Sequence, residues 1–343
     1  MNNSVISVDL AKNVFQVCAL NKNHKPVFNK KVNRSKLLDT LRNLEANQVV
    51  MEACYSSNYW GREIEKLGFT VGLIPPHQVK PFVVGNKNDH NDAIAIAEAS
   101  FRPRTTFVPV KTLTQQDIQS LHRIRERYVK ARTSIANQLR GLLAEYGIIV
   151  KKNIGMLRKN VPCILENPEN DLTATARQFI AELYEELQYY DDLIGRKEIA
   201  IKTLLKDNAD YQRLLEVPGI GPIVGSAVIA SVGNAKQFKN GRQMAAWIGL
   251  TPKQYASGDI SRISGISKRG NQTLRRLFIH GARAIVNWCE KKNDALSLWI
   301  KSLLKTKHPC KVVVAVANKL ARMTWAVLAK NEHYMAPSLT AAG

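Results

Sequence analysis

The N-terminal part of the chain alternates between short strand-forming runs and helical segments, and this order restricts the folds open to it. Three strand-forming runs follow one another directly, and two more are each preceded by a segment with helical spacing. Consecutive strands predict a meander, and a strand that follows a helix predicts a crossover unit. We therefore expect a sheet covered by helices. The expected strands are residues 4–10, 14–20, 26–32, 48–52 and 69–74, and the expected helices are 35–45 and 57–67.

Two long helical stretches follow an extended strip with two prolines at residues 102–109. Apolar and aromatic residues recur at three-four spacing from Ile118 to Tyr146, and again from Ala176 to Ile194. Two such seams predict an antiparallel helical hairpin or coiled coil. The spacing leaves open whether the seams pack within one chain or join copies of the chain in a homo-oligomer.

A glycine-rich turn, Val217-Pro-Gly-Ile-Gly-Pro-Ile-Val-Gly225, precedes an apolar helical segment. It resembles a helix-hairpin-helix, whose turn exposes backbone amides, here at Gly219 and Gly221, to a phosphate. The same glycines equally fit a simple turn between helices, because glycine adopts positive φ freely. Residues 236–331 are expected to be mostly helical, with one non-helical insert at 249–270.

Basic residues are concentrated in the last third of the chain. The whole sequence has a formal net charge of +22, and residues 232–343 alone carry 19 Lys and Arg against 4 Asp and Glu. A density of this kind repels itself unless a polyanion neutralises it, so it favours nucleic acid over a merely solvated surface.

The five cysteines are scattered and form no Cys-x-x-Cys pair, which predicts reduced thiols and argues against a zinc ribbon. The N-terminus shows no export signal, and the longest late apolar run, residues 312–317, is too short to cross a bilayer. We therefore expect a cytoplasmic protein with no membrane partner.

Four carboxylates occupy positions that suit a metal-dependent nuclease. Asp9 and Glu52 each close a strand-forming run, while Asp89 and Asp92 open an expected helix and share one of its faces. Each acid alone also fits an exposed residue or a helix cap. Together they predict a site for Mg²⁺, or alternatively Mn²⁺, that faces a phosphate backbone, because hard cations take oxygen ligands.

A second group combines a serine with cations in and after the non-helical insert. Its members are Ser257, Lys268, Arg269, Arg275 and Arg276. A serine beside a glycine is sterically open, and nearby cations can steady a transferring phosphoryl group. The pair also fits an ordinary turn, and three further serines remain alternatives: Ser261, Ser264 and Ser267. The four cations, with the amides at Gly219 and Gly221, are the candidate nucleic-acid contacts.

Four motifs, in this order, resemble the DEDD insertion-sequence transposases, the insertion sequence one-ten family. The likeness covers nearly the whole chain, from about Ser4 to Ala329. The motifs are Lys87-Asn-Asp89-His-Asn-Asp92-Ala-Ile-Ala-Ile-Ala-Glu98, Val217-Pro-Gly-Ile-Gly221, Trp247-Ile-Gly-Leu-Thr-Pro252 leading to Ser257-Gly258, and Ile266-Ser-Lys-Arg-Gly270-Asn.

The order of elements and this resemblance imply an α/β plus α architecture in three parts. Residues 1–110 are expected to form a ribonuclease H-like (RuvC-like) DEDD metal domain. Residues 111–208 are expected to form a helical coiled-coil linker. Residues 209–335 would then be a mostly helical serine transposase domain that contains the helix-hairpin-helix.

The resemblance also implies a chemistry. Asp9, Glu52, Asp89 and Asp92 would be the family's metal set, and Ser257 its serine nucleophile, so that magnesium and serine act together on a DNA strand. Members excise and insert their element, and many are guided by a structured noncoding RNA. A homo-oligomer, a dimer or a tetramer, is expected. Where the family motif commonly continues Ser-Gly-Gly-Lys, an acid, Asp259, follows Gly258 in this chain.

Three functions are compatible with these residues. The first is a DNA transposase or recombinase that forms a transient phosphoserine bond, and the ordered motifs favour it. The second is a metal-dependent DNA nuclease or junction resolvase in which water attacks and the serine is structural. The third is a non-catalytic nucleic-acid binder. Protein covalently attached to cleaved DNA separates the first from the second, and dependence of cleavage on Mg²⁺ separates both from the third.

Overall fold

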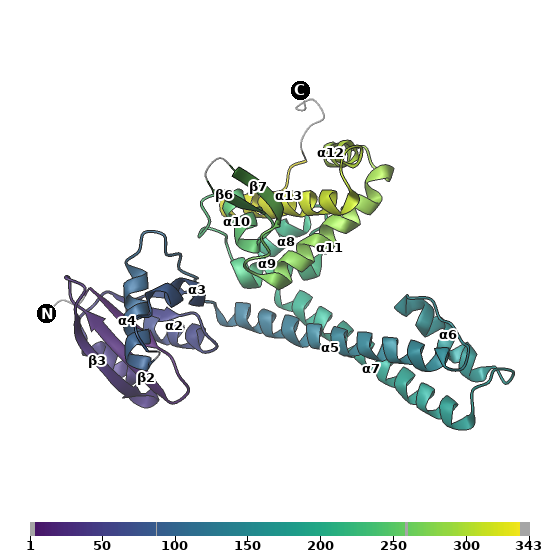
Figure 1. The fold of residues 1–343 in the computed structure, drawn as a ribbon, viewed down its shortest axis with the longest axis horizontal. Coiled ribbons are helices and arrows are strands. Elements are labelled where there is room, and N and C mark those ends of the chain that lie inside the picture. Colours follow the sequence, from purple (N-terminus) through teal and green to yellow (C-terminus); the bar gives the residue numbers. More distant parts are fainter. Residues whose placement is uncertain (1–3, 87, 258–259, 337–343) are drawn as a thin grey trace. The chain divides into compact units, whose positions relative to one another are not determined.

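The computed structural model describes residues 4–86, 88–257 and 260–336 (Figure 1). Two motif residues named above, Lys87 and Gly258, lie outside these ranges, as does Asp259. The chain divides into two compact units, Met1–Leu113 and Thr114–Gly343.

The first unit is built on a five-stranded sheet with the strand order β3-β2-β1-β4-β5. The pairs β1–β2 and β2–β3 are antiparallel, whereas β1–β4 and β4–β5 are parallel. This is the meander followed by crossovers that the sequence predicts. The strands are β1 Val5–Asp9, β2 Val14–Leu20, β3 Pro26–Asn33, β4 Gln48–Glu52 and β5 Thr70–Ile74. The helices are α1 Leu37–Arg42, α2 Ser57–Glu65, α3 Pro76–Val79 and α4 Asp89–Ser100, with 3₁₀ turns at Arg34–Lys36 and Lys80–Phe82.

The two faces of this sheet bury different helices, because successive strand residues point to opposite sides. On one face, Val5 and Val50 pack against α4, whose Ile96 is fully buried. On the other face, Ile6 and Val8 belong to a core completed by α1 and α2. Helical coverage of both faces explains why β1 and β4 are apolar almost throughout.

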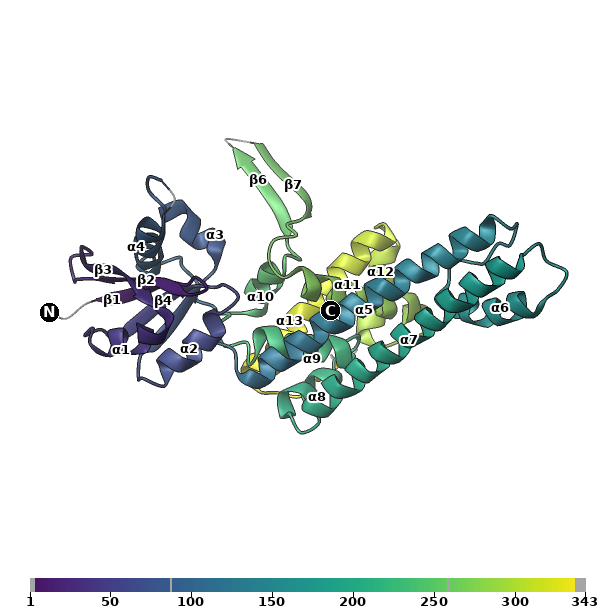
Figure 2. The same cartoon turned by 90° about the horizontal axis from the view of Figure 1, so that it is seen from below.

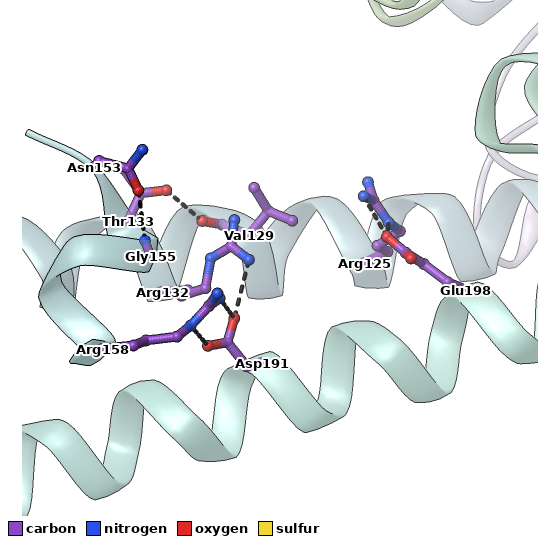
Figure 3. A network of polar contacts seen from close by, with 9 residues as sticks. All are labelled: Arg125, Val129, Arg132, Thr133, Asn153, Gly155, Arg158, Asp191 and Glu198. Atoms are coloured by element: carbon purple, nitrogen blue, oxygen red, sulfur yellow. Dashed lines mark hydrogen bonds and ion pairs between the residues drawn. The ribbon is translucent and has the colours of Figure 1, made fainter. Parts of the chain in front are cut away.

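In the second unit, the two predicted long helices form a hairpin within the chain. They are α5 Leu113–Ala144 and α7 Ala174–Leu204, with α6 Ile154–Glu166 between them. Part of the predicted seam is ionic: Arg125 donates to Glu198, and Arg132 and Arg158 both pair with Asp191 (Figure 3). These bonds fix the register of the two helices. The described contacts show that the seam of α5 packs against the seam of α7 in the same chain.

The rest of this unit is helical apart from one β-hairpin, as the sequence predicts for the insert at 249–270. The helices are α8 Ala209–Leu215, α9 Pro222–Val232, α10 Gly241–Ile248, α11 Gln272–Trp288, α12 Ala295–Leu304 and α13 Pro309–Lys330, with a 3₁₀ turn at Cys289–Lys291. The hairpin consists of β6 Pro252–Ser257 and β7 Ile260–Ile266. Among the described helices, α13 alone is long and apolar enough to span a membrane, but its Val312, Val316 and Leu320 are fully buried in the core of this unit.

The glycine-rich turn before α9 lies directly against α11. A Cβ on Gly281 would stand 2.2 Å from the Gly219 carbonyl oxygen, and a Cβ on Gly219 would stand 2.7 Å from the side chain of Ile285. Gly219 also has a positive φ of 77°. The absence of side chains at both glycines therefore permits the turn and the helix to approach closely.

This contact predicts opposite effects for two glycine-to-alanine changes within helices. Gly281→Ala should destabilise the protein by about 1–3 kcal/mol, because the new methyl group has no space beside the turn. Gly195→Ala is the matched control: nothing lies within 4 Å of its added Cβ, so alanine should stabilise α7 by up to about 1 kcal/mol. Urea unfolding followed by circular dichroism measures both, and a neutral Gly281→Ala would contradict the close approach.

Candidate functional site

Asp9 and Glu52 are neighbours on one face of the sheet. They end the adjacent parallel strands β1 and β4, whose register pairs Val8 with Met51 one position earlier. By alternation, both acids lie on the side that also carries Ser7 and that α4 covers. Each is partly buried. The strand order thus brings two carboxylates from distant parts of the sequence to the same sheet edge.

The first turn of α4 is held over the same face. Asn88 caps the helix, because its side chain accepts from the Asn91 amide. The buried hydroxyl of Ser7 donates to the Ala93 carbonyl oxygen at 2.6 Å, so that β1 and the start of α4 are joined directly. Asp92 precedes Ala93 and is partly buried.

Asp89 is paired with a lysine in this structure. Its carboxylate lies 3.5 Å from the ammonium nitrogen of Lys31 on β3, and both side chains are mostly exposed. Within residues 4–86, 88–257 and 260–336, no group of three or more His, Cys, Asp or Glu is arranged to hold a metal ion. The four predicted carboxylates therefore share one region of the first unit without forming a closed cluster.

The donor chemistry of Asp9 and Glu52 nevertheless suits a magnesium ion. Mg²⁺ prefers oxygen ligands and is usually bound by one or two carboxylates together with substrate phosphates and water, rather than by an all-protein cage. A pair of carboxylates at the end of two rigid strands meets that requirement.

The sequence reasoning missed two polar residues beside this pair. Gln16 lies directly opposite Asp9 in the β1–β2 register and is 5% exposed. Its Nε2 donates to Asn29 Oδ1 at 2.5 Å. The sequence held a signal for Gln16, because it is an uncharged polar residue inside the apolar run Val14-Phe-Gln-Val-Cys18.

Ser257 ends β6 on a hairpin that projects from the helices of the second unit (Figure 2). All residues of β6 are exposed. In the hairpin register Ser257 faces Ile260, and Tyr255 faces Arg262. Because side chains alternate along a strand, Ser257, Tyr255 and Arg262 share one face, and the neighbouring Ser261 lies on the other.

The alternative serines differ in their exposure. Ser261 and Ser264 are exposed on β7, whereas Ser267 follows the strand and is half-buried. Ser267 also donates its backbone amide to the Thr251 carbonyl at the base of the hairpin. The hairpin thus presents three open hydroxyls, of which Ser257 belongs to the pair closest to the turn.

Backbone packing holds the base of this hairpin. A Cβ on Gly249 would lie 2.0 Å from the Arg269 carbonyl oxygen, and one on Gly270 would lie 1.8 Å from the Trp247 carbonyl oxygen. Both glycines have positive φ, and so does Lys268. Two of the motifs identified in the sequence therefore lie against each other through their glycines, and the exposed Lys268 and Arg269 belong to this junction.

Arg275 is buried, at 9% exposed, beneath the same junction. Its guanidinium donates to the carbonyl oxygens of Ile248, at 3.0 Å, and Arg269, at 3.3 Å. Its neighbour Arg276 instead reaches Glu126 of α5 at 3.0 Å. Hydrogen bonding and charge from Arg276 lower the pKa of the Glu126 carboxyl. In this structure the Arg275 side chain binds backbone carbonyl oxygens, whereas that of Arg276 remains partly exposed.

The two glycines proposed for phosphate contact are also distinct. Gly219 is packed against α11. This close packing accounts for the positive φ of Gly219, so no ligand is needed to explain it. Gly221 is the N-cap residue of α9, and a Cβ there would meet nothing within 4 Å. Of these two positions, Gly221 is the open one.

A basic groove in the second unit was not identified from the sequence as a site. It has a volume of about 1010 Å³ and lies along α13, beside α10 and the base of the hairpin. Among the described residues that line it, five are cationic and none is acidic. The cations are Arg242, Lys311, Lys319, Arg322 and Lys330. Lys319 Nζ stands 4.3 Å above the ring of Trp299, and burial, with the charge of Arg322, lowers the pKa of that lysine.

Comparisons with known proteins agree over almost the whole chain. A family model of DEDD transposases of the IS110 type matches residues 6–148, and one described as "Transposase IS116/IS110/IS902 family" matches residues 211–296. The chain is 45% identical over 335 residues to a probable family 20 transposase of Pseudomonas aeruginosa. The matched region covers 97% of this chain and 99% of the relative.

Two further relatives are transposases for named insertion sequence elements. That of IS1111A from Coxiella burnetii is 42% identical over 330 residues, covering 96% of this chain and 91% of the relative. That of IS1328 from Yersinia enterocolitica is 36% identical over 328 residues, covering 95% and 97%.

The different surroundings of the two adjacent arginines predict different effects on stability. Arg275→Met should destabilise the second unit by about 1–3 kcal/mol, because two carbonyl oxygens lose a buried donor. Arg276→Gln should cost about 1 kcal/mol or less, since its ion pair is partly solvated. Urea unfolding followed by tryptophan fluorescence tests this, because four of the five tryptophans lie after residue 113. Equal destabilisation by both variants would contradict a buried structural role for Arg275.

Proposed function

Since the chain belongs to the IS110 family of transposases, enzymes that cleave and transfer DNA strands, we propose that it moves its element through two sets of groups: carboxylates that hold Mg²⁺, and the hydroxyl of Ser257. The observation that carries the first set is the placement of Asp9 and Glu52 on adjacent parallel strands and one face. The exposure of Ser257 near the end of the hairpin supports the second.

The first unit supports this assignment through its topology. Three antiparallel strands followed by two parallel strands, with helices on both faces, is the arrangement expected of a ribonuclease H-like domain. In such a domain the acids come from the first strand, the fourth strand and a later helix. Asp9, Glu52 and the first turn of α4 occupy those three elements.

Asp9 and Glu52 would hold the cation, with Asp92 and Asp89 supplied from the start of α4. Bound there, Mg²⁺ or Mn²⁺ would neutralise charge on a phosphate oxygen as the strand is cleaved. The protein's own contribution is to hold two carboxylates on rigid strands. The bond from Ser7 to Ala93 fixes the height of α4 above them.

Ser257 would attack the scissile phosphorus. A bond forms between its Oγ and phosphorus while the bond to one deoxyribose oxygen breaks, and the hydroxyl proton lost by serine is balanced by one taken up on the leaving oxygen. The phosphoserine ester retains the energy of the phosphodiester, so a new strand end can displace the serine without ATP. Arg262, on the same hairpin face, is suitably placed to neutralise phosphate charge.

The basic second unit would bind the polynucleotides. The groove along α13 offers five cations and the exposed junction adds Lys268 and Arg269. Both the DNA ends and a structured noncoding guide RNA are suitable occupants, because their backbones are polyanions. A dimer or tetramer is proposed as well, and its contact between copies would use surfaces other than the α5–α7 seam, because that seam is filled within the chain.

Ser257→Ala should abolish strand exchange while DNA binding stays within about twofold, because the exposed side chain contributes no packing. Ser261→Ala is the matched control on the opposite face of the same hairpin and should retain exchange. The measurement is recombination of a plasmid that carries the element ends, with binding followed by fluorescence anisotropy. Normal exchange by Ser257→Ala would exclude this serine as the nucleophile.

The same assay separates the transposase reaction from simple hydrolysis. Protein trapped covalently on cleaved DNA, and absent for Ser257→Ala, supports serine attack, because attack by water leaves no adduct. Cleavage that proceeds in the Ser257→Ala variant without any adduct would instead identify a metal-dependent nuclease or junction resolvase.

Neutralising groove cations should weaken DNA binding and reduce its dependence on salt. For Arg242→Gln with Arg322→Gln, the slope of log K against log salt should become shallower by about 0.9 for every DNA phosphate that the variant no longer neutralises. Lys305→Gln is the control, because this exposed lysine is the C-cap residue of α12 and does not line the groove. Anisotropy titrations at several salt concentrations measure the slopes, and an unchanged slope for the double variant would exclude the groove as a phosphate site.

A further inference from the structure

The side-chain amide of Gln16 is buried in a fixed orientation. Asn29 Nδ2 donates to the carbonyl oxygen of His90 at 3.2 Å. A carbonyl oxygen can only accept, so Asn29 must direct its own oxygen toward Gln16. The Gln16 Nε2 fills that position at 2.5 Å. This chain of bonds leaves the Gln16 oxygen as the group that still requires a donor.

Gln16 Oε1 has no hydrogen-bond partner among the residues that the structure describes, although it is inaccessible to solvent. A buried acceptor without a donor costs about 1–3 kcal/mol, so such a group marks a place where a further donor belongs. Gln16 lines a polar cavity of about 590 Å³, whose other described lining residues are Asn29, Lys30, Lys31, Asn88, Asp89 and His90. The cavity is thus bordered by β2, β3 and the start of α4.

The position of Gln16 relates this acceptor to the proposed cation. Its Cα pairs with that of Asp9 in the antiparallel register, and both residues point to the face covered by α4. Side chains opposite each other in such a pair have Cβ atoms about 4.5–5.5 Å apart. The register therefore places Gln16 next to Asp9, which ends β1.

We propose that Gln16 is a positioning residue for the divalent cation: its Oε1 accepts a hydrogen bond from a water in the hydration shell of the ion held by Asp9. This rests on the proposed metal function of Asp9. Mg²⁺ keeps several of its waters when it binds to proteins, and those waters are strong donors. Asn29 and the carbonyl of His90 orient the amide, so this outer contact links β2, β3 and α4 to the metal site.

The test measures binding of Mn²⁺ to the full-length protein by titration calorimetry, without DNA. Gln16→Met keeps the size of the side chain but removes its acceptor, and it should weaken Mn²⁺ binding at this site by about tenfold or more, as loss of an outer hydrogen bond does elsewhere. Gln16→Glu keeps an oxygen at this position and adds a negative charge beside the cation, so it should bind Mn²⁺ more tightly than Gln16→Met does.

Two further variants make the result specific. Asp9→Asn should remove this binding event altogether. Asn21→Ala is the control in the same unit: it deletes a side chain that accepts from two backbone amides in the β2–β3 turn, at the opposite end of β2 from Gln16. It should leave Mn²⁺ binding unchanged.

Each outcome decides between the two proposals. If Asp9→Asn abolishes binding while Gln16→Met binds Mn²⁺ normally, Gln16 has no role at the cation and only this inference fails. If Asp9→Asn binds Mn²⁺ normally, the proposed metal function itself fails. If thermal melting shows that Gln16→Met does not fold, the variant Asn29→Ala is used in its place. Loss of the Asn29 side chain frees the Gln16 amide to rotate. Affinity weakened several-fold then supports the inference, and unchanged affinity overturns it.

Discussion

The parallel pairing of β1 with β4 is the constraint on which the first unit depends. It places the ends of two strands side by side, although about forty residues of sequence separate them. Their last residues, Asp9 and Glu52, lie on the same face of the sheet. A shift of the register by one residue would turn Glu52 to the opposite face while Asp9 stayed in place. The apolar residues of the two strands prevent such a shift. Val8 and Met51, for example, fill the core beneath α1 and α2. Core packing thus determines where the carboxylates lie.

The second unit uses backbone proximity for a similar purpose. Gly249 and Gly270 allow two loops to touch, and Arg275 satisfies carbonyl oxygens from both sides of the junction. The two described strands of the hairpin contribute no buried residue, since all of β6 and all but the last residue of β7 are exposed. Its orientation therefore depends on this base, and a buried arginine serves that purpose because its planar fork of donors can bind several carbonyls at once.

Several features of the fold were predictable because they follow from short-range patterns. Short strand-forming runs located the five strands described in the first unit, and three-four spacing located α5 and α7. Burial of Arg275 and the bond from Gln16 to Asn29 were not predictable, because both depend on partners that only the folded chain brings together. The same limit applies to α6, which continues through Pro162. The sequence around it shows prolines and no long seam.

The ion pair between Lys31 and Asp89 explains how an open set of acids is compatible with a metal site. Four carboxylates brought together without a cation would repel one another, and Lys31 draws one of them aside. An exposed pair of this kind contributes about 1 kcal/mol or less, so little opposes its release. A divalent ion carries twice the charge of lysine, and a DNA phosphate would compete for Lys31 itself. If Asp9 and Glu52 hold a cation as proposed, arrival of substrate and cation together would favour movement of Asp89 from the lysine toward those two acids, while the bond from Ser7 keeps the helix in place.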